Sequence, residues 1–268
     1  MPRHTFPLDG PINLLVRIGH GSVTVDTEDH LAEATVVIEP GKNAADLLDQ
    51  TVIMMSGRTL TVAAPRQGGV FDLPVFGRRS NRSLDVKVIV PTGTAIKIST
   101  VTAPITVGGR VGGADLAFGA ADAVLRRVDG DLRLRYGSGT ARAVEIAGSV
   151  ELRSGSGSAQ FGEVGGAINA GCGSGNLDVR VVRGAVRSRC GSGTARLGAV
   201  HGDVDVATGS GGLEIGLPIG VTARLDVHTG SGHVRSDLPI EDHPTSAKDA
   251  ITVRAKTGSG DVRLFRAA

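Results

Sequence analysis

The stretch YGSGTARAVEIAGSVELRSGSG, from Tyr136 to Gly157, contains the tripeptide Gly-Ser-Gly twice, and the two copies begin eighteen residues apart. The tripeptide begins on this spacing, and later after longer intervals, at Gly137, Gly155, Gly173, Gly191, Gly209, Gly230 and Gly258. A further glycine lies eleven residues after most of these starts, as at Gly148 and Gly166. Glycine at both places is typical of tight bends, which need positive φ or leave no room for a side chain. Each unit therefore divides into two halves, each a strand followed by a turn.

Between the glycines, apolar residues alternate with polar ones. In the quoted stretch, Val150 and Leu152 enclose Glu151, and the next unit repeats the pattern with Ile168, Asn169 and Ala170. A period of two indicates strands with one buried face. Strands this short cannot bury a face alone, whereas stacked units can, with a rise of roughly 4.8 Å per turn. A propeller blade needs about 40 residues. The pattern therefore predicts an all-β fold, a single-chain parallel β-solenoid (β-helix) with turns of eighteen residues.

The repeat also predicts how the chain is organised. Residues 1–98 are expected to form irregular β turns that cap the solenoid and continue into it, with a short helical turn at Asn43 to Gln50. Residues 99–236 form the regular solenoid, and residues 237–268 a loop excursion followed by closing strands, all in one domain. The open ends of such a stack expose unpaired backbone, so we expect capping or end-to-end association.

Composition narrows the classes of protein further. The chain has 268 residues, with 29 basic and 27 acidic side chains, so net charge identifies no partner. Two cysteines are too few for a disulfide framework. No apolar run reaches the ~20 residues of a membrane span, and no signal peptide is visible at the start. We expect a cytoplasmic protein, with export to the cell surface by another route left open.

Two phrases resemble a known family. They are VIVPTGTAIKISTVTAPITVGG at residues 88–109 and TGSGDV at Thr257 to Val262, with Gly-Ser-Gly units between them. From about Asp85 to Leu264 the chain resembles a bacterial β-strand-repeat domain family of unknown function labelled "putative adhesin". The resemblance implies a parallel β-helix with no accepted catalytic residues and no cofactor.

One group of arginines is a candidate interaction face. They fall at outward positions of one sheet, on a regular rise: Arg133, Arg135, Arg153, Arg187 and Arg189. Such a stripe could follow an anionic polymer, either nucleic acid or an acidic glycan. The alternative is a solvated face that pairs with Glu151, Glu145 and Asp131. Because acidic neighbours interrupt the stripe and no aromatics lie between the arginines for base stacking, we do not expect nucleic acid.

The two cysteines form a second candidate, a thiol pair. Cys172 and Cys190 each precede a Gly-Ser-Gly and so share one column, which reads Phe118, Tyr136, Ser154, Cys172, Cys190, Thr208, Thr229. Stacking would place their α-carbons roughly 4.8 Å apart, within reach of a disulfide. A parallel stacked pair does not easily reach the required torsion, and we expect two free thiols.

Three other patterns resemble calcium, metal or phosphate sites but lack residues that such sites require. Only Asp261 is a carboxylate directly after a Gly-Ser-Gly, which argues against a calcium-binding roll. His228 and His233 flank one turn without further ligands, so we expect a solvent-facing pair and no metal. GCGSGN at Gly171 to Asn176 precedes a strand, not the helix that a phosphate-binding loop requires.

These observations favour a non-catalytic scaffold or adhesin-like interaction protein of unknown partner, with no cofactor. The alternative is a binder of an anionic polymer through the arginine face. A remote alternative is a glycan-active enzyme with Asp242 and His243 in the loop at 237–250.

Overall fold

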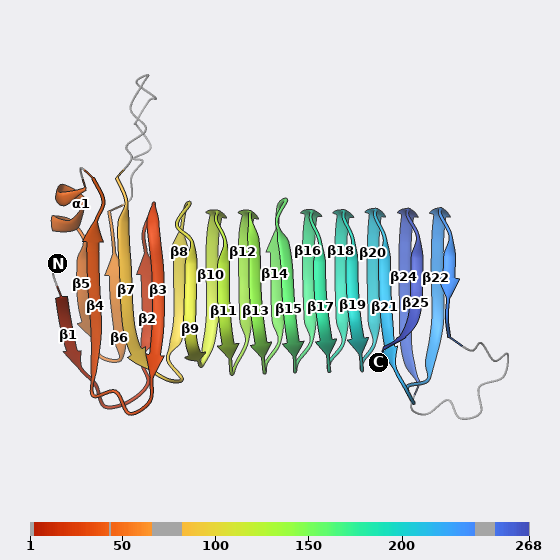
Figure 1. The fold of residues 1–268 in the computed structure, drawn as a ribbon, viewed down its shortest axis with the longest axis horizontal. Coiled ribbons are helices and arrows are strands. Elements are labelled where there is room, and N and C mark those ends of the chain that lie inside the picture. Colours follow the sequence, from red (N-terminus) through yellow and green to blue (C-terminus); the bar gives the residue numbers. More distant parts are fainter. Residues whose placement is uncertain (1–2, 43, 66–81, 239–249, 268) are drawn as a thin grey trace, which may run out of the picture. The chain divides into compact units, whose positions relative to one another are not determined.

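The computed structural model describes residues 3–42, 44–65, 82–238 and 250–267. It is all-β, with long stacks of parallel strands in two sheets, here called sheet A and sheet B (Figure 1). Two compact units, Met1–Asp129 and Gly130–Ala268, divide the chain. The domain boundaries expected at residues 98 and 236 stay predictions.

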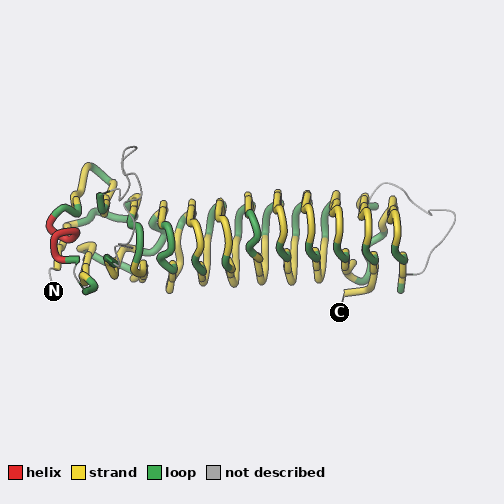
Figure 2. Tube along the Cα trace, turned by 90° about the horizontal axis from the view of Figure 1, so that it is seen from above, coloured by secondary structure: helices red, strands yellow, loops and turns green. Residues whose placement is uncertain are grey.

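In the second unit, consecutive strands alternate between the two sheets, as the tube in Figure 2 shows. Sheet B contains, in spatial order, β12 (Leu132–Ser138), β14 (Val150–Ser154), β16 (Ile168–Ser174), β18 (Val186–Ser192), β20 (Val204–Ser210), β24 (Ile251–Ser259) and β22 (Ala223–Ser231). Sheet A contains β13 (Thr140–Ile146), β15 (Ser158–Val164), β17 (Leu177–Val182), β19 (Ala195–Val200), β21 (Leu213–Pro218), β25 (Val262–Ala267) and β23 (Val234–Ser236). Neighbouring strands within each of these two sets are parallel.

The eighteen-residue spacing of the sequence is the register of the sheets. Val150 pairs with Ile168, Ile168 with Val186, and Val186 with Val204. These side chains are buried, as are Ala159, Leu177 and Ala195 in the facing sheet. Stacked apolar columns from the two sheets therefore form the core, and each strand contributes its alternate residues to it.

The C-terminal end of the second unit does not follow chain order. β24 pairs with β20 on one side and β22 on the other, and β25 lies in the same way between β21 and β23. The expectation that residues after 250 close the stack is therefore wrong, because they occupy the penultimate position. Thr208 and Thr229, which the sequence suggested as direct neighbours in the column of Cys172 and Cys190, are separated by Thr257, which pairs with both.

The first unit shows a similar interleaving. Its sheet A runs β1 (Arg3–Pro7), β4 (Glu33–Pro40), β7 (Leu84–Pro91), β3 (Gly21–Glu28), β9 (Ile105–Val111) and β11 (Ala123–Val128). Its sheet B runs β5 (Val52–Ser56), β6 (Thr59–Ala63), β2 (Asn13–Arg17), β8 (Ala95–Thr100) and β10 (Gly113–Ala120). The early strands β2 and β3 thus lie between later ones, since β2 pairs in parallel with β6 and β8.

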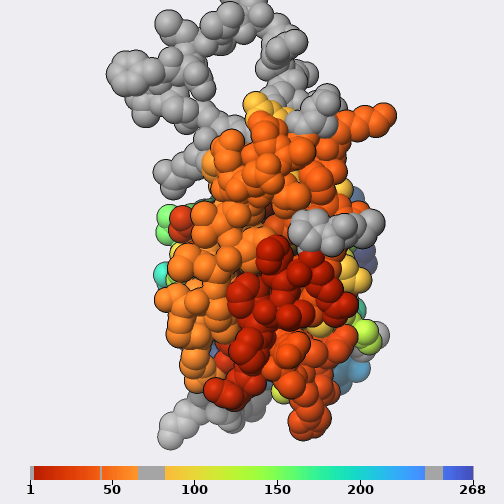
Figure 3. Space-filling model, turned by 90° about the vertical axis from the view of Figure 1, so that its left-hand side faces the viewer, coloured from red at the N-terminus to blue at the C-terminus, as the bar shows by residue number. Residues whose placement is uncertain are grey.

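Antiparallel strands and one helix lie at one end of this unit. β1 pairs with β4, β4 with β7, and β5 with β6, all antiparallel. The helix α1 (Ala45–Asp49) falls inside the expected helical turn and buries Leu47, while Asn43 lies outside the described residues. Seen from this end, red and orange atoms of the first 65 residues form much of the surface (Figure 3).

Candidate functional site

The five candidate arginines lie on the outer face of sheet B in the second unit, on β12, β14 and β18. We call this surface the arginine face. It consists of two columns of outward residues that run across the strands, fixed by the parallel register. The mixed column contains Arg133, Glu151, Asn169, Arg187, Asp205, Arg254 and Asp226. The basic column contains Arg135, Arg153, Gly171, Arg189, Ala207, Lys256 and His228.

The carboxylates of the mixed column each lie within 4 Å of nitrogen atoms of two basic side chains. Glu151 accepts a hydrogen bond from Nε of Arg133 at 2.8 Å, and its other oxygen lies 3.3 Å from a guanidinium nitrogen of Arg153. Asp226 lies 2.8 Å from Nε2 of His228 and 4.0 Å from Nε of Arg254. Each of these pairs is solvent-exposed, so each contributes at most about 1 kcal/mol to stability.

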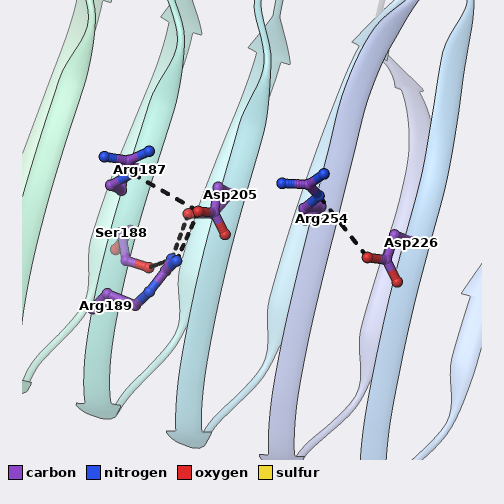
Figure 4. A network of polar contacts seen from close by, with 6 residues as sticks. All are labelled: Arg187, Ser188, Arg189, Asp205, Asp226 and Arg254. Carbon is purple, nitrogen blue, oxygen red and sulfur yellow. Dashed lines mark hydrogen bonds and ion pairs between the residues drawn. The ribbon is translucent and has the colours of Figure 1, made fainter.

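Asp205 on β20 repeats this sharing with the two arginines of β18 (Figure 4). Arg189 donates to its carboxylate at 2.7 Å, and Arg187 approaches to 3.8 Å. Arg189 also donates to the main-chain carbonyls of Ser188 at 3.0 Å and Asp205 at 2.8 Å. The hydrogen bond from Arg189 lowers the pKa of Asp205, and the charges of Arg189, Arg187 and Arg254 lower it further. Asp205 is therefore ionised at neutral pH and holds Arg189 in one position.

The two columns differ in net charge. Among the described residues of the mixed column, three arginines face three carboxylates, whereas the basic column has three arginines and Lys256 and no carboxylate. The three acidic residues that the sequence suggested as partners of the arginines do not all lie on the arginine face. Glu151 is on the arginine face, Asp131 accepts a hydrogen bond from the Ser149 N–H, and Glu145 belongs to β13 in sheet A. The arginine face therefore carries an excess of positive charge.

A hollow of about 670 Å³ lies on this face over β12, β14, β16 and β18. The side chains around it include Arg135, Glu151, Arg153, Asn169 and Arg189, with Gly171 between them. A Cβ added to Gly171 would meet no atom within 4 Å. The missing side chain at this one position of the basic column therefore leaves an open space between Arg153 and Arg189. The sequence position of Gly171, eighteen residues after Arg153, is a signal that the sequence reasoning missed.

Cys172 and Cys190 form a disulfide, so the expectation of two free thiols is wrong. They are register partners on β16 and β18, with a Cα–Cα distance of 4.6 Å. The stacking predicted from the sequence is therefore present, and it brings the side chains close enough to join. Cys172 borders the hollow, and the bond ties together two of the strands beneath it.

Tyr136, the single tyrosine of the chain, precedes Cys172 in the same column and is 5% exposed. Its hydroxyl donates to the carbonyl of Ser158 at 2.8 Å. Burial raises the pKa of Tyr136 to about 12, because the phenolate would lose water, and a hydrogen bond with Ser154 offsets this only partly.

We expect Tyr136 to ionise near pH 12, about two units above free tyrosine, in a titration of absorbance at 295 nm. The chain has no tryptophan, so the signal comes from this residue alone. Since folding raises the pKa of Tyr136, the protonated phenol contributes to the free energy of unfolding. This contribution is complete below pH 10 and is lost as the pH rises from about 10 to 12. Tyr136→Phe removes both the signal and this part of the pH dependence. A midpoint near pH 10 in a sample that circular dichroism shows to be folded would contradict the prediction.

Of the remaining candidate positions, His228 belongs to the basic column, His233 lies outside both columns, and two others fall outside the described residues. His233 lies 3.6 Å from Asp261 and His228 pairs with Asp226, so the two histidines have separate carboxylate partners. In the described part of the chain, no three His, Cys, Asp or Glu side chains are grouped to hold a metal ion. Asp242 and His243 lie outside the described residues. None of the helices described here has the length and apolar character needed to cross a membrane.

The chain is similar to several solved bacterial structures over nearly its whole length. One, from Parabacteroides merdae and described as a "putative adhesin", is 12% identical with a TM-score of 0.42, covering 98% of this chain and 95% of the other. Another adhesin so described, from Bacteroides fragilis, is 14% identical with a TM-score of 0.38, covering 98% and 97%. A "putative lipid binding protein" from Parabacteroides distasonis is 13% identical with a TM-score of 0.41, covering 98% and 96%.

No protein-family model matches the chain, and no curated protein is similar to it. Two of these three solved structures are described as a "putative adhesin", which is the label of the family that the sequence resembles.

Proposed function

We propose that the chain is a non-catalytic, adhesin-like binding module built as a parallel β-solenoid. The observation that carries this proposal is the repetition of outward positions across sheet B of the second unit. From β12 to β22, each strand adds one residue to the mixed column and one to the basic column. Because the inward positions are filled by packed side chains, recognition would fall to this repetitive exterior.

The electrostatics of the described residues support binding over catalysis. The carboxyl groups with a resolved shift have a lowered pKa, as Asp205 does beside Arg189 and Glu214 beside Arg196. A general acid or base needs a pKa close to the working pH, which for a carboxyl group means a raised one. The paired carboxylates therefore order the surface and are poorly suited to proton transfer.

We also propose that the chain works outside the cytoplasm, in place of the cytoplasmic location expected from the sequence. The support for this is the Cys172–Cys190 disulfide, since such bonds persist in oxidising compartments and are reduced in the cytosol. Alkylation of thiols in intact producing cells, before lysis, should leave both cysteines unlabelled. Full labelling of both would contradict an exported location. The end-to-end association expected of a stacked sheet remains a separate prediction.

Binding to a bacterial cell-envelope fraction tests the function. We expect the immobilised chain to retain envelope components saturably and to release them in salt with unchanged mass. Neither the chain nor the retained envelope components are altered chemically, because a binding module forms and breaks no covalent bond. Conversion of a retained component during incubation would contradict a non-catalytic role, and absence of saturable retention would contradict binding.

A further inference from the structure

The hollow over Gly171 has the features of an anion-binding site. It lies where the basic column lacks a side chain, with Arg153 on one neighbouring strand and Arg189 on the other. Asn169, the next outward residue on the same strand, borders it, and no residue in the described part of the chain bonds its side-chain amide. A group placed there would lie between Arg153 and Arg189, beside the side-chain amide of Asn169, with no side chain below it.

The charge balance around the hollow favours a negative ligand. Glu151 is shared by two arginines on one side, and Asp205 by two arginines on the other. Each cluster therefore holds one positive charge more than its carboxylate neutralises. Arg153 is 75% exposed and lies 3.3 Å from Glu151, so it can turn toward a ligand at little cost. Arg189 is held by three hydrogen bonds to Ser188 and Asp205, so it acts as a fixed positive charge at the edge of the hollow.

We propose that an acidic polysaccharide lies along the basic column and that this hollow binds one of its anionic groups, a carboxylate or a sulfate. The proposal rests on the binding function proposed above and names the class of ligand for the arginine face. Charge along the column would hold the polymer, and the gap at Gly171 would fix its position.

The spacing of charge favours a polysaccharide over nucleic acid. The basic column spans seven strands, from Arg135 on β12 to His228 on β22, or about 29 Å at the usual strand separation. Its four permanent cations, from Arg135 to Lys256, span five strand separations or about 24 Å and so lie about 8 Å apart on average. Duplex DNA carries a charge about every 1.7 Å. Neither column contains a Phe, Tyr or Trp side chain on which a base could stack. A polymer with sparser charge matches this face better.

Binding of the full chain to polygalacturonate and to dextran sulfate, at about 0.05 M salt, tests the proposal, with neutral dextran and duplex DNA alongside. The first polymer carries only carboxylates and the second only sulfates, so the two arms identify the anion. We expect binding to at least one acidic polysaccharide, none to neutral dextran and weaker binding to DNA. Gly171→Glu and Arg153→Glu should each raise the Kd at least tenfold. Gly171→Glu fills the hollow with opposite charge, where its Cβ meets no atom within 4 Å.

Arg142→Glu is the matched control, because it makes the same charge change as Arg153→Glu, but on β13 in sheet A, where Arg142 donates a hydrogen bond to Gln160. It should change the Kd less than twofold, and the melting temperatures of all three variants show whether they fold. Equal weakening by all three would overturn the proposal, since net charge alone would then explain binding. Duplex DNA bound as tightly as the polysaccharides would also overturn it. Absence of polysaccharide binding overturns this inference alone if envelope retention persists, and absence of both overturns the proposed function as well.

Discussion

Gly193→Ala is expected to lower the free energy of unfolding by about 4 kcal/mol, which is among the largest effects of a single methyl group. Gly193 has a φ of +124°, a conformation that side chains rarely adopt. An added Cβ would also lie 2.1 Å from the carbonyl oxygen of Gly175, its counterpart one turn earlier. That atom is main chain, so the contact can be relieved only by a shift of the backbone, which disturbs the alignment of the neighbouring strands. Urea unfolding followed by circular dichroism measures the loss, which corresponds to a drop of roughly 10 °C in Tm.

Gly171→Ala is the matched control for this prediction. It lies in the strand just before the previous corner, has no positive φ, and its added Cβ would meet no atom within 4 Å. We expect it to be neutral or stabilising by up to about 1 kcal/mol, since alanine restricts the unfolded chain more than glycine does. If Gly193→Ala and Gly171→Ala lower the free energy of unfolding by the same amount, the stacking of corners does not require glycine at position 193.

The inward and outward faces of the strands could be predicted because alternation is a local property of the sequence. Phe161 and Leu177 are buried where the period of two places them. The pattern holds even at Ser188, which is fully buried although its side chain is polar, with its hydroxyl 3.7 Å from Sγ of Cys190. The register of eighteen residues followed from the corners in the same way.

The order of strands at the ends could not be read from the sequence. Residues 223–231 and 251–259 have the same alternation and the same Gly-Ser-Gly, so both segments fit the columns that β20 offers. The choice between them depends on packing beyond the repeat. The sharing of Glu151 and Asp205 between pairs of arginines was also out of reach, because it depends on side-chain rotamers as well as on register. The disulfide was out of reach as well, because stacking brings Cys172 and Cys190 together without deciding whether their sulfur atoms join.

The observed order at the C-terminal end predicts that Val262→Asp is far more damaging than Val234→Asp. These valines are register partners on adjacent strands, β25 and β23, and so occupy the same column. Val262 lies between β21 and β23 and is fully buried, while Val234 is on the last strand of sheet A and is 47% exposed. A carboxylate at position 262 would be buried without a partner, at a cost of at least about 4 kcal/mol.

The same carboxylate at position 234 can reach water, and we expect a loss below about 1 kcal/mol. The midpoint of urea unfolding for the two variants, measured against the unmodified chain, gives the comparison. If the strands stacked in chain order, β23 would be interior and β25 terminal, and the ranking of the two variants would be reversed. The pair therefore distinguishes the interleaved order from the simple one with substitutions of identical chemistry, because only the position of the strand in the sheet differs between them.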